Sequence, residues 1–104
     1  MFHTHNDRQI NINGTCLQGY VDQNYNVLVQ LFGKPMYWGG PKVQWEWQIL
    51  FKDGEVATIY DWKNYHIHKP EEVTNWHIGG NNPVVVTRVK NIISEYLDSQ
   101  ALSQ

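Results

Sequence analysis

The chain of 104 residues has little cysteine, little charge and no long apolar run. Its single cysteine, Cys16, cannot form an internal disulfide, which favours a reducing compartment such as the cytoplasm. With 41% hydrophobic and 17% charged residues, the composition matches neither a disordered tail nor a membrane protein. Residues 1–8 are polar and argue against a secretory signal. We therefore expect one cytoplasmic domain spanning residues 1–104, without a membrane partner.

An excess of positive charge is also lacking. The formal net charge is -2 with a pI of about 6.2, which argues against nucleic acid as a partner because a broad basic face is missing. The nucleophile motif GxSxG, the phosphate-binding GxGxxG and P-loop patterns and the zinc motif HExxH do not occur. No catalytic residue can be named from motifs, and we expect no cofactor.

Aromatic residues, by contrast, are abundant, with 5 Trp and 6 Tyr. Their large apolar rings with polar tips suit ligand pockets and interfaces. A small domain also needs bulky residues to fill its core, so the sequence predicts a core position for most of them.

The first predicted elements are a hairpin and a short helix. Residues 10–12 and 15–18 flank Asn13-Gly14, a strong two-residue turn signal. The helix follows, capped by Asp22 or Asn24 and ended by Gly33 and Pro35. Its apolar side consists of Tyr25, Leu28, Leu31 and Phe32, and residues 37–41 form a loop.

A second hairpin has the clearest pattern, with strict alternation over residues 43–51, a turn at Asp53-Gly54 and a return strand over 56–62. A loop of two or four residues places three Trp and a Tyr on one face, which is the core or a core that opens into a cleft. The predicted pairs are Phe51 with Val56, Ile49 with Thr58, Trp47 with Tyr60, and Trp45 with Trp62.

The chain then forms a short strand at 76–78 and a final helix that begins with Asn82 as cap and Pro83 at the first position. Residues 1–8 and 99–104 are expected to be frayed. The predicted fold class is α+β: an antiparallel sheet of four to five strands packed by two helices. One face of the sheet is left bare, which favours a homodimer.

Three groups of residues could carry chemistry. In the predicted register Glu46 faces Asp61, and such a carboxylate pair needs compensation by a metal, a raised pKa, or the nearby Lys42 and Lys63.

A divalent metal site for a hydrolase or nuclease could combine side chains from three segments, with Glu46 as general base. Its ligands would be Asp61, His66, His68 and His77. Solvated loop histidines are the simpler interpretation of His66 and His68.

The third group lies at the start of the last helix, where backbone amides and the helix dipole favour an anion. An ordinary helix cap is the simpler interpretation. The predicted ligand-binding residues are Trp38, Trp62, Trp76, Gly79, Gly80, Asn81 and Asn82.

The run ATIYDWK at residues 57–63 and the run WHIGG at 76–80, with the helix end at 31–35, resemble a family of small, functionally uncharacterised proteins of bacteriophages and large DNA viruses. The resemblance covers roughly residues 14–93. It implies a viral accessory protein in the host cytoplasm that acts by non-enzymatic binding of a host protein or a small anionic ligand. The alternatives are the metal-dependent hydrolase and a structural subunit of a virion or another assembly.

Overall fold

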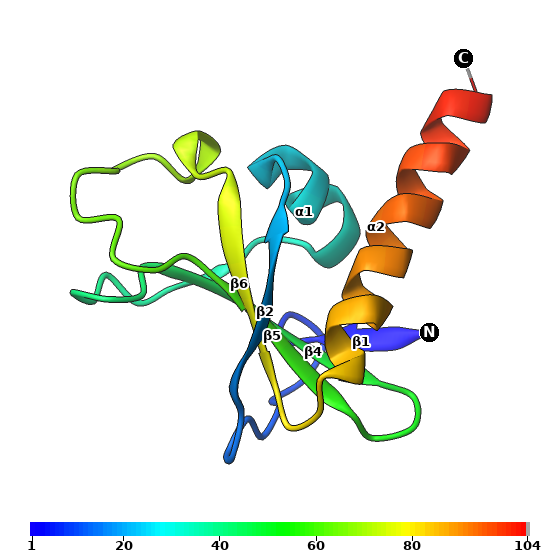
Figure 1. Cartoon of the computed structure of the whole chain (residues 1–104), viewed down its shortest axis with the longest axis horizontal. Helices are drawn as coiled ribbons and strands as arrows, with labels where there is room; N and C mark the ends of the chain where they lie inside the picture. Colours follow the sequence, from blue (N-terminus) through cyan, green and yellow to red (C-terminus); the bar gives the residue numbers. More distant parts are fainter. Residues whose placement is uncertain (104) are drawn as a thin grey trace.

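The computed structural model describes residues 1–103, which form an α+β domain with one antiparallel sheet and two α-helices (Figure 1). The predicted fold class is therefore confirmed. The elements are β1 (Phe2–Thr4), β2 (Cys16–Asp22), α1 (Tyr25–Phe32), β3 (Met36–Tyr37), β4 (Trp45–Phe51), β5 (Val56–Tyr60), a 3-10 turn at Pro70–Glu72, β6 (Asn75–Gly80) and α2 (Val84–Leu102).

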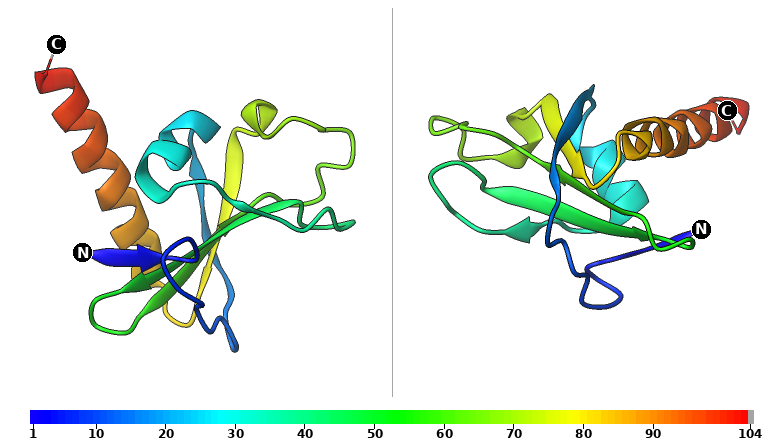
Figure 2. Two further views of the ribbon diagram at one scale, coloured as in Figure 1. Left: turned by 180° about the vertical axis from the view of Figure 1, so that it is seen from behind. Right: turned by 60° about the horizontal axis from the view of Figure 1, so that its bottom comes forward.

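The sheet has the strand order β1-β4-β5-β6-β2, and the short β3 pairs with β4 beside β1. Both helices pack on one face of this twisted sheet, as the two views of Figure 2 show. The core lies between that face and the helices. It contains Leu28 and Phe32 from α1, Val85, Val89 and Ile93 from α2, and Trp47, Ile49, Ile59, Trp76 and Ile78 from the sheet.

Two tryptophans form the centre of this core. The rings of Trp47 and Trp76 meet edge to face, with 5.2 Å between their centroids. Both indole N–H groups are satisfied: Trp47 donates to the carbonyl of Gly33 at 2.7 Å and Trp76 to that of Gln23 at 3.0 Å. Buried tryptophans need such acceptors, and here residues that flank α1 on either side provide them.

The β4–β5 hairpin has a register that differs by one residue from the prediction. Its loop contains three residues, 52–54, because the N–H of Phe51 donates to the carbonyl of Glu55 at 2.8 Å. Gly54 adopts the left-handed conformation, with φ of +92°, as expected for a three-residue hairpin loop. Trp47 consequently pairs with Ile59 and Ile49 with Ala57. The prediction that three Trp and a Tyr share one face was wrong: Tyr60 and Trp62 belong to the other face.

The predicted first hairpin was also wrong. A turn does form at Asn13-Gly14, where the N–H of Thr15 donates to the carbonyl of Ile12 at 3.2 Å. Residues 10–12, however, are not a strand, and β2 pairs with β6 at the far edge of the sheet. A turn signal defines the local chain reversal but not the strand that pairs across the sheet.

The chain ends are more ordered than predicted. Phe2 of β1 pairs with Phe51 and packs on Phe32, with ring centroids 5.4 Å apart, so the polar start of the chain is held by one apolar anchor. Residues 99–102 continue α2, since no glycine or proline interrupts it there. Residue 104 lies outside the described residues.

The predicted helix signals are present at both helices, although α2 begins at Val84, one residue after the predicted Pro83. The side-chain oxygen of Asn24, rather than Asp22, accepts the N–H of Asn26 at 2.7 Å, and Gly33 ends α1 with φ of +80°. At the start of α2, the side-chain oxygen of Asn82 accepts the N–H of Val84 at 3.0 Å, and Pro83 has helical backbone angles.

Candidate functional site

The face of the sheet opposite the helices contains a row of four polar and aromatic side chains. Glu46, Tyr60, His77 and Tyr20 are successive register partners across β4, β5, β6 and β2. Register partners in an antiparallel sheet share a face, so these four side chains stand on the same side. We call this side the open face, because no helix covers it.

Part of the open face is covered by the chain that connects β1 to β2. Arg8 and Leu50 line one hollow, Thr15 and Thr58 line another, and the Ile10 side chain is buried. The other end of the open face, toward Trp62 and Tyr20, remains accessible to solvent.

Four rings at that end form one contiguous group, which we call the aromatic patch: Tyr20, Tyr60, Trp62 and His77. His77 is at its centre, with ring centroids 4.8 Å from Tyr20, 5.4 Å from Tyr60 and 5.7 Å from Trp62. Trp62 stacks on the His77 ring, whereas Tyr20 meets it edge to face. Tyr20 is 51% exposed and Trp62 38% exposed.

Next to the aromatic patch is a hollow of about 200 Å³, lined by Thr15, Cys16, Val43, Glu46, Thr58, Tyr60, Trp62 and Gly79. Glu46 is only 9% exposed, and one of its oxygens accepts a hydrogen bond of 2.9 Å from Nε2 of Gln48. Position 79 has no space for a side chain, because a Cβ atom on Gly79 would lie 2.5 Å from Oγ1 of Thr58.

Burial shifts the pKa values of two groups of the aromatic patch, His77 and Tyr60. Burial lowers the pKa of His77, and the negative charge of Asp61 offsets part of this effect. Burial, followed by the negative charge of Glu46, raises the pKa of Tyr60 above its usual value. The positive charges near the patch are two lysines at Trp62: Nζ of Lys42 lies 5.9 Å and Nζ of Lys63 lies 5.7 Å from the centre of the indole ring.

The predicted carboxylate pair of Glu46 and Asp61 was wrong, because the shifted register places Tyr60 opposite Glu46. Asp61 is fully buried, and its Oδ1 accepts the backbone N–H groups of Gln44 and Trp45, each at 2.8 Å. Asp61 therefore holds the start of β4 in place.

The four predicted metal ligands do not converge. Asp61 is buried, His66 and His68 are exposed in the loop before β6, and His77 belongs to the aromatic patch. Residues 1–103 contain no group of three or more His, Cys, Asp or Glu side chains that could hold a metal ion.

The seven predicted ligand-binding residues are also divided among different places. Trp76 is fully buried in the core, and Gly80 faces α2, where a Cβ atom would lie 2.6 Å from Cγ2 of Val85. Trp38 is exposed in the loop after β3, while Asn81 and Asn82 lie in the turn before α2, where Asn82 acts as the cap. Trp62 and Gly79, in contrast, both line the hollow.

Tyr20, Tyr60 and Thr58 were not predicted as site residues. Their face depends on the β4–β5 register and on the pairing of β2 with β6. Gly54 was the available signal, since a glycine at the third position of a three-residue loop gives the observed register.

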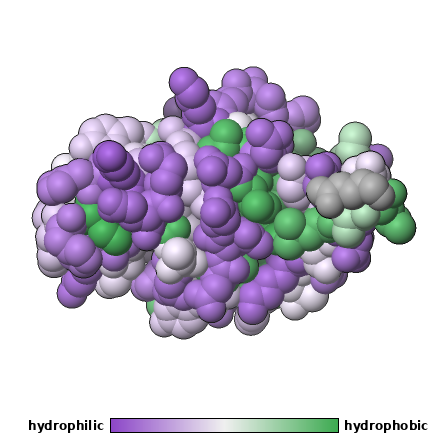
Figure 3. Space-filling model, turned by 90° about the horizontal axis from the view of Figure 1, so that it is seen from above, coloured by the Kyte–Doolittle hydropathy of each residue, from purple (hydrophilic) through white to green (hydrophobic). Residues whose placement is uncertain are grey.

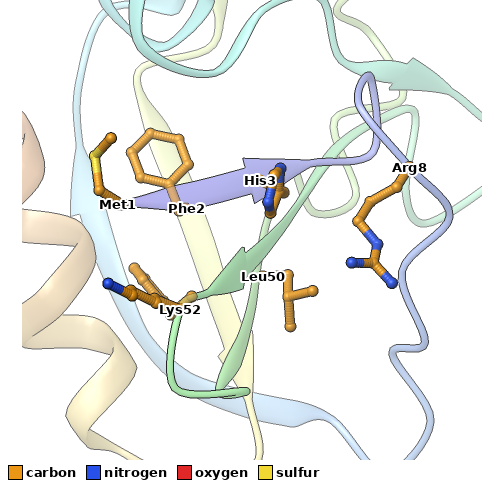
Figure 4. A pocket seen from close by; sticks show the side chains of 7 residues that line it. Met1, Phe2, His3, Arg8, Leu50 and Lys52 are labelled. Atoms are coloured by element: carbon orange, nitrogen blue, oxygen red, sulfur yellow. The ribbon is translucent and has the colours of Figure 1, made fainter.

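Three larger hollows lie near β1, with volumes of about 440, 560 and 370 Å³. Figure 4 shows the first, where Met1 and the β1 residues Phe2 and His3 lie near Arg8, Leu50 and Lys52. Its titratable side chains, those of His3, Arg8 and Lys52, are all exposed. Figure 3 shows apolar surface toward the projecting end of α2, where Leu97 and Leu102 are exposed. None of these regions contains a buried ionisable side chain, so the hollow at Glu46 is the better candidate.

Comparison of the chain with protein families, curated proteins and solved structures gives no match. The resemblance to small viral proteins therefore stays a prediction. Among the described residues, no helix has the length and apolar character needed to cross a membrane.

Proposed function

We propose that this protein is a non-enzymatic binding protein and that the aromatic patch is its contact surface. The observation that supports this proposal is the contiguity of four rings on the open face, two of them exposed by more than a third. Tyrosine and tryptophan bury large areas on binding with little loss of side-chain entropy, and they dominate the energetics of many interfaces.

A protein partner fits this surface better than a small anion does. The predicted anion pose needs free amides at the start of α2 and a neighbouring ring from Trp76, Trp62 or Trp38. Trp62 lies in the aromatic patch and Trp38 in the loop after β3. Trp76 is fully buried, however, and the Val84 N–H donates to Asn82. The resemblance to phage and large-DNA-virus proteins favours a host protein in the host cytoplasm as that partner.

Native mass spectrometry of the untagged protein, purified from the cells that produce it, tests the proposal. We expect an additional protein mass on the wild type that is absent from the double variant Tyr20→Ser, Trp62→Ser. The matched control is Tyr37→Ser, Tyr65→Ser, which removes two tyrosines of 68% and 63% exposure outside the patch.

Two outcomes would contradict the proposal: a wild type without any bound protein, and a bound mass that the patch variant retains. A bound mass equal to a second copy of the chain would show that the protein forms a homodimer instead of binding a host protein. A large discrete assembly would instead favour a structural subunit.

A further inference from the structure

We infer that the hollow beside the aromatic patch binds the primary ammonium group of a lysine side chain presented by the partner, with Glu46 as its counter-ion. This inference rests on the proposed function and adds to it the chemistry that the partner must present.

The first argument is the charge of Glu46. Removing a carboxylate from water is unfavourable unless a cation or several hydrogen-bond donors compensate. Glu46 is nine-tenths buried, and its hydrogen bond comes from the neutral amide of Gln48. In residues 1–103, no Lys, Arg or His nitrogen lies within ion-pair distance of Glu46. A cation delivered by a partner would provide the missing compensation.

The second argument concerns the kind of cation. A guanidinium group binds best to a carboxylate through two parallel hydrogen bonds that use both oxygens. Oε2 of Glu46 already accepts from Gln48. An ammonium group acts as a point charge and needs one free oxygen, so lysine is favoured over arginine.

The third argument is size and wall chemistry. The hollow measures about 200 Å³, which is smaller than the roughly 300–1,000 Å³ of typical small-molecule sites. A hollow of this size is suited to a single side chain of a partner protein. The rings of Tyr60 and Trp62 form part of the wall, where they can cover the methylene stem of a lysine and attract its charged end.

The two lysines near Trp62 limit the charge of the ligand. The ammonium groups of Lys42 and Lys63 lie within 6 Å of the ring centre of Trp62, which lines the hollow. A ligand with several positive charges would be repelled there. The partner is thus expected to present an isolated lysine rather than a basic cluster.

The test is an NMR titration of ¹⁵N-labelled protein with N-acetyl-lysine methylamide, following the Gly79 amide and the Trp62 indole N–H. We expect saturable shifts at both groups and a dissociation constant about tenfold weaker in Glu46→Gln, since one charged hydrogen bond is lost. Glu95→Gln, an exposed change of equal charge on α2, should leave the titration unchanged.

Within the wild type, N-acetyl-norleucine methylamide provides a neutral comparison that needs no variant to fold, and N-acetyl-arginine methylamide should bind more weakly than the lysine probe. Equal shifts with the norleucine probe, equal binding by Glu46→Gln, or no saturable shift at Gly79 and Trp62 would each overturn the inference. If the lysine probe fails while the patch variant still loses its partner, the proposed function stands and only the lysine chemistry is wrong.

Discussion

Asp61 is the residue whose role differs most from its prediction. Its carboxylate is fully buried and accepts two backbone N–H groups at the start of β4, while Oδ2 has no hydrogen-bond partner in the described residues. Asp61→Ala would leave the N–H groups of Gln44 and Trp45 without an acceptor. We expect the free energy of unfolding to fall by about 3 kcal/mol, because each hydrogen bond to a charged group contributes about 1.5–3 kcal/mol. Urea unfolding measures this difference.

The matched control is Asp98→Ala, which removes an exposed carboxylate from α2 and should change the free energy of unfolding by less than about 0.5 kcal/mol. If Asp61→Ala were equally mild, Asp61 would not be the group that anchors β4. A catalytic or metal-binding role, in contrast, predicts a variant of unchanged or increased stability.

At the level of elements, the seating of α2 on the sheet depends on two glycines. A Cβ atom on Gly19 would lie 2.9 Å from Cγ2 of Val86, and one on Gly80 would lie 2.6 Å from Cγ2 of Val85 and 3.0 Å from the carbonyl oxygen of Val56. Gly80→Ala forces a packed helix away from the sheet. The expected loss in the free energy of unfolding is about 1–3 kcal/mol, the usual range for overpacking.

A double-variant cycle identifies the cause of that loss. Val85→Ala removes the methyl groups that Cβ would meet, so Gly80→Ala with Val85→Ala should lose less than the sum of the two single losses. Losses that simply add would show that the helix contact is not responsible.

The elements also show how far sequence patterns determine this fold. Capping at Asn24 and Asn82, the end of α1 at Gly33 and the strand at Trp45–Phe51 follow from local sequence patterns, and all were predictable. Registers and strand partners were not. The Asp53-Gly54 signal fits loops of two or three residues, and a change of one residue moves Tyr60 and Trp62 to the opposite face. The aromatic patch was hidden for this reason, since it combines four side chains from β2, β6, β5 and the segment after β5.

At the scale of the whole molecule, the two ends of the chain contribute differently to stability. β1 covers part of the edge of β4, and Phe2 packs on Phe32. Residues 97–103 are all exposed, and the last turns of α2 project beyond the sheet (Figure 1). Ordered secondary structure is thus found at both ends, but only the N-terminal end is packed against the core.

Two truncations test this asymmetry. A chain that ends at Leu97 should keep its free energy of unfolding within about 1 kcal/mol, because residues 98–103 are all exposed. A chain that begins at His5 loses the Phe2 ring and the pairing of β1, and should lose about 2–3 kcal/mol. Thermal unfolding separates the two, since about 1 kcal/mol corresponds to roughly 4–8 °C for a domain of this size. Equal losses would mean that the projecting turns of α2 contribute to the fold through contacts that the described packing does not contain.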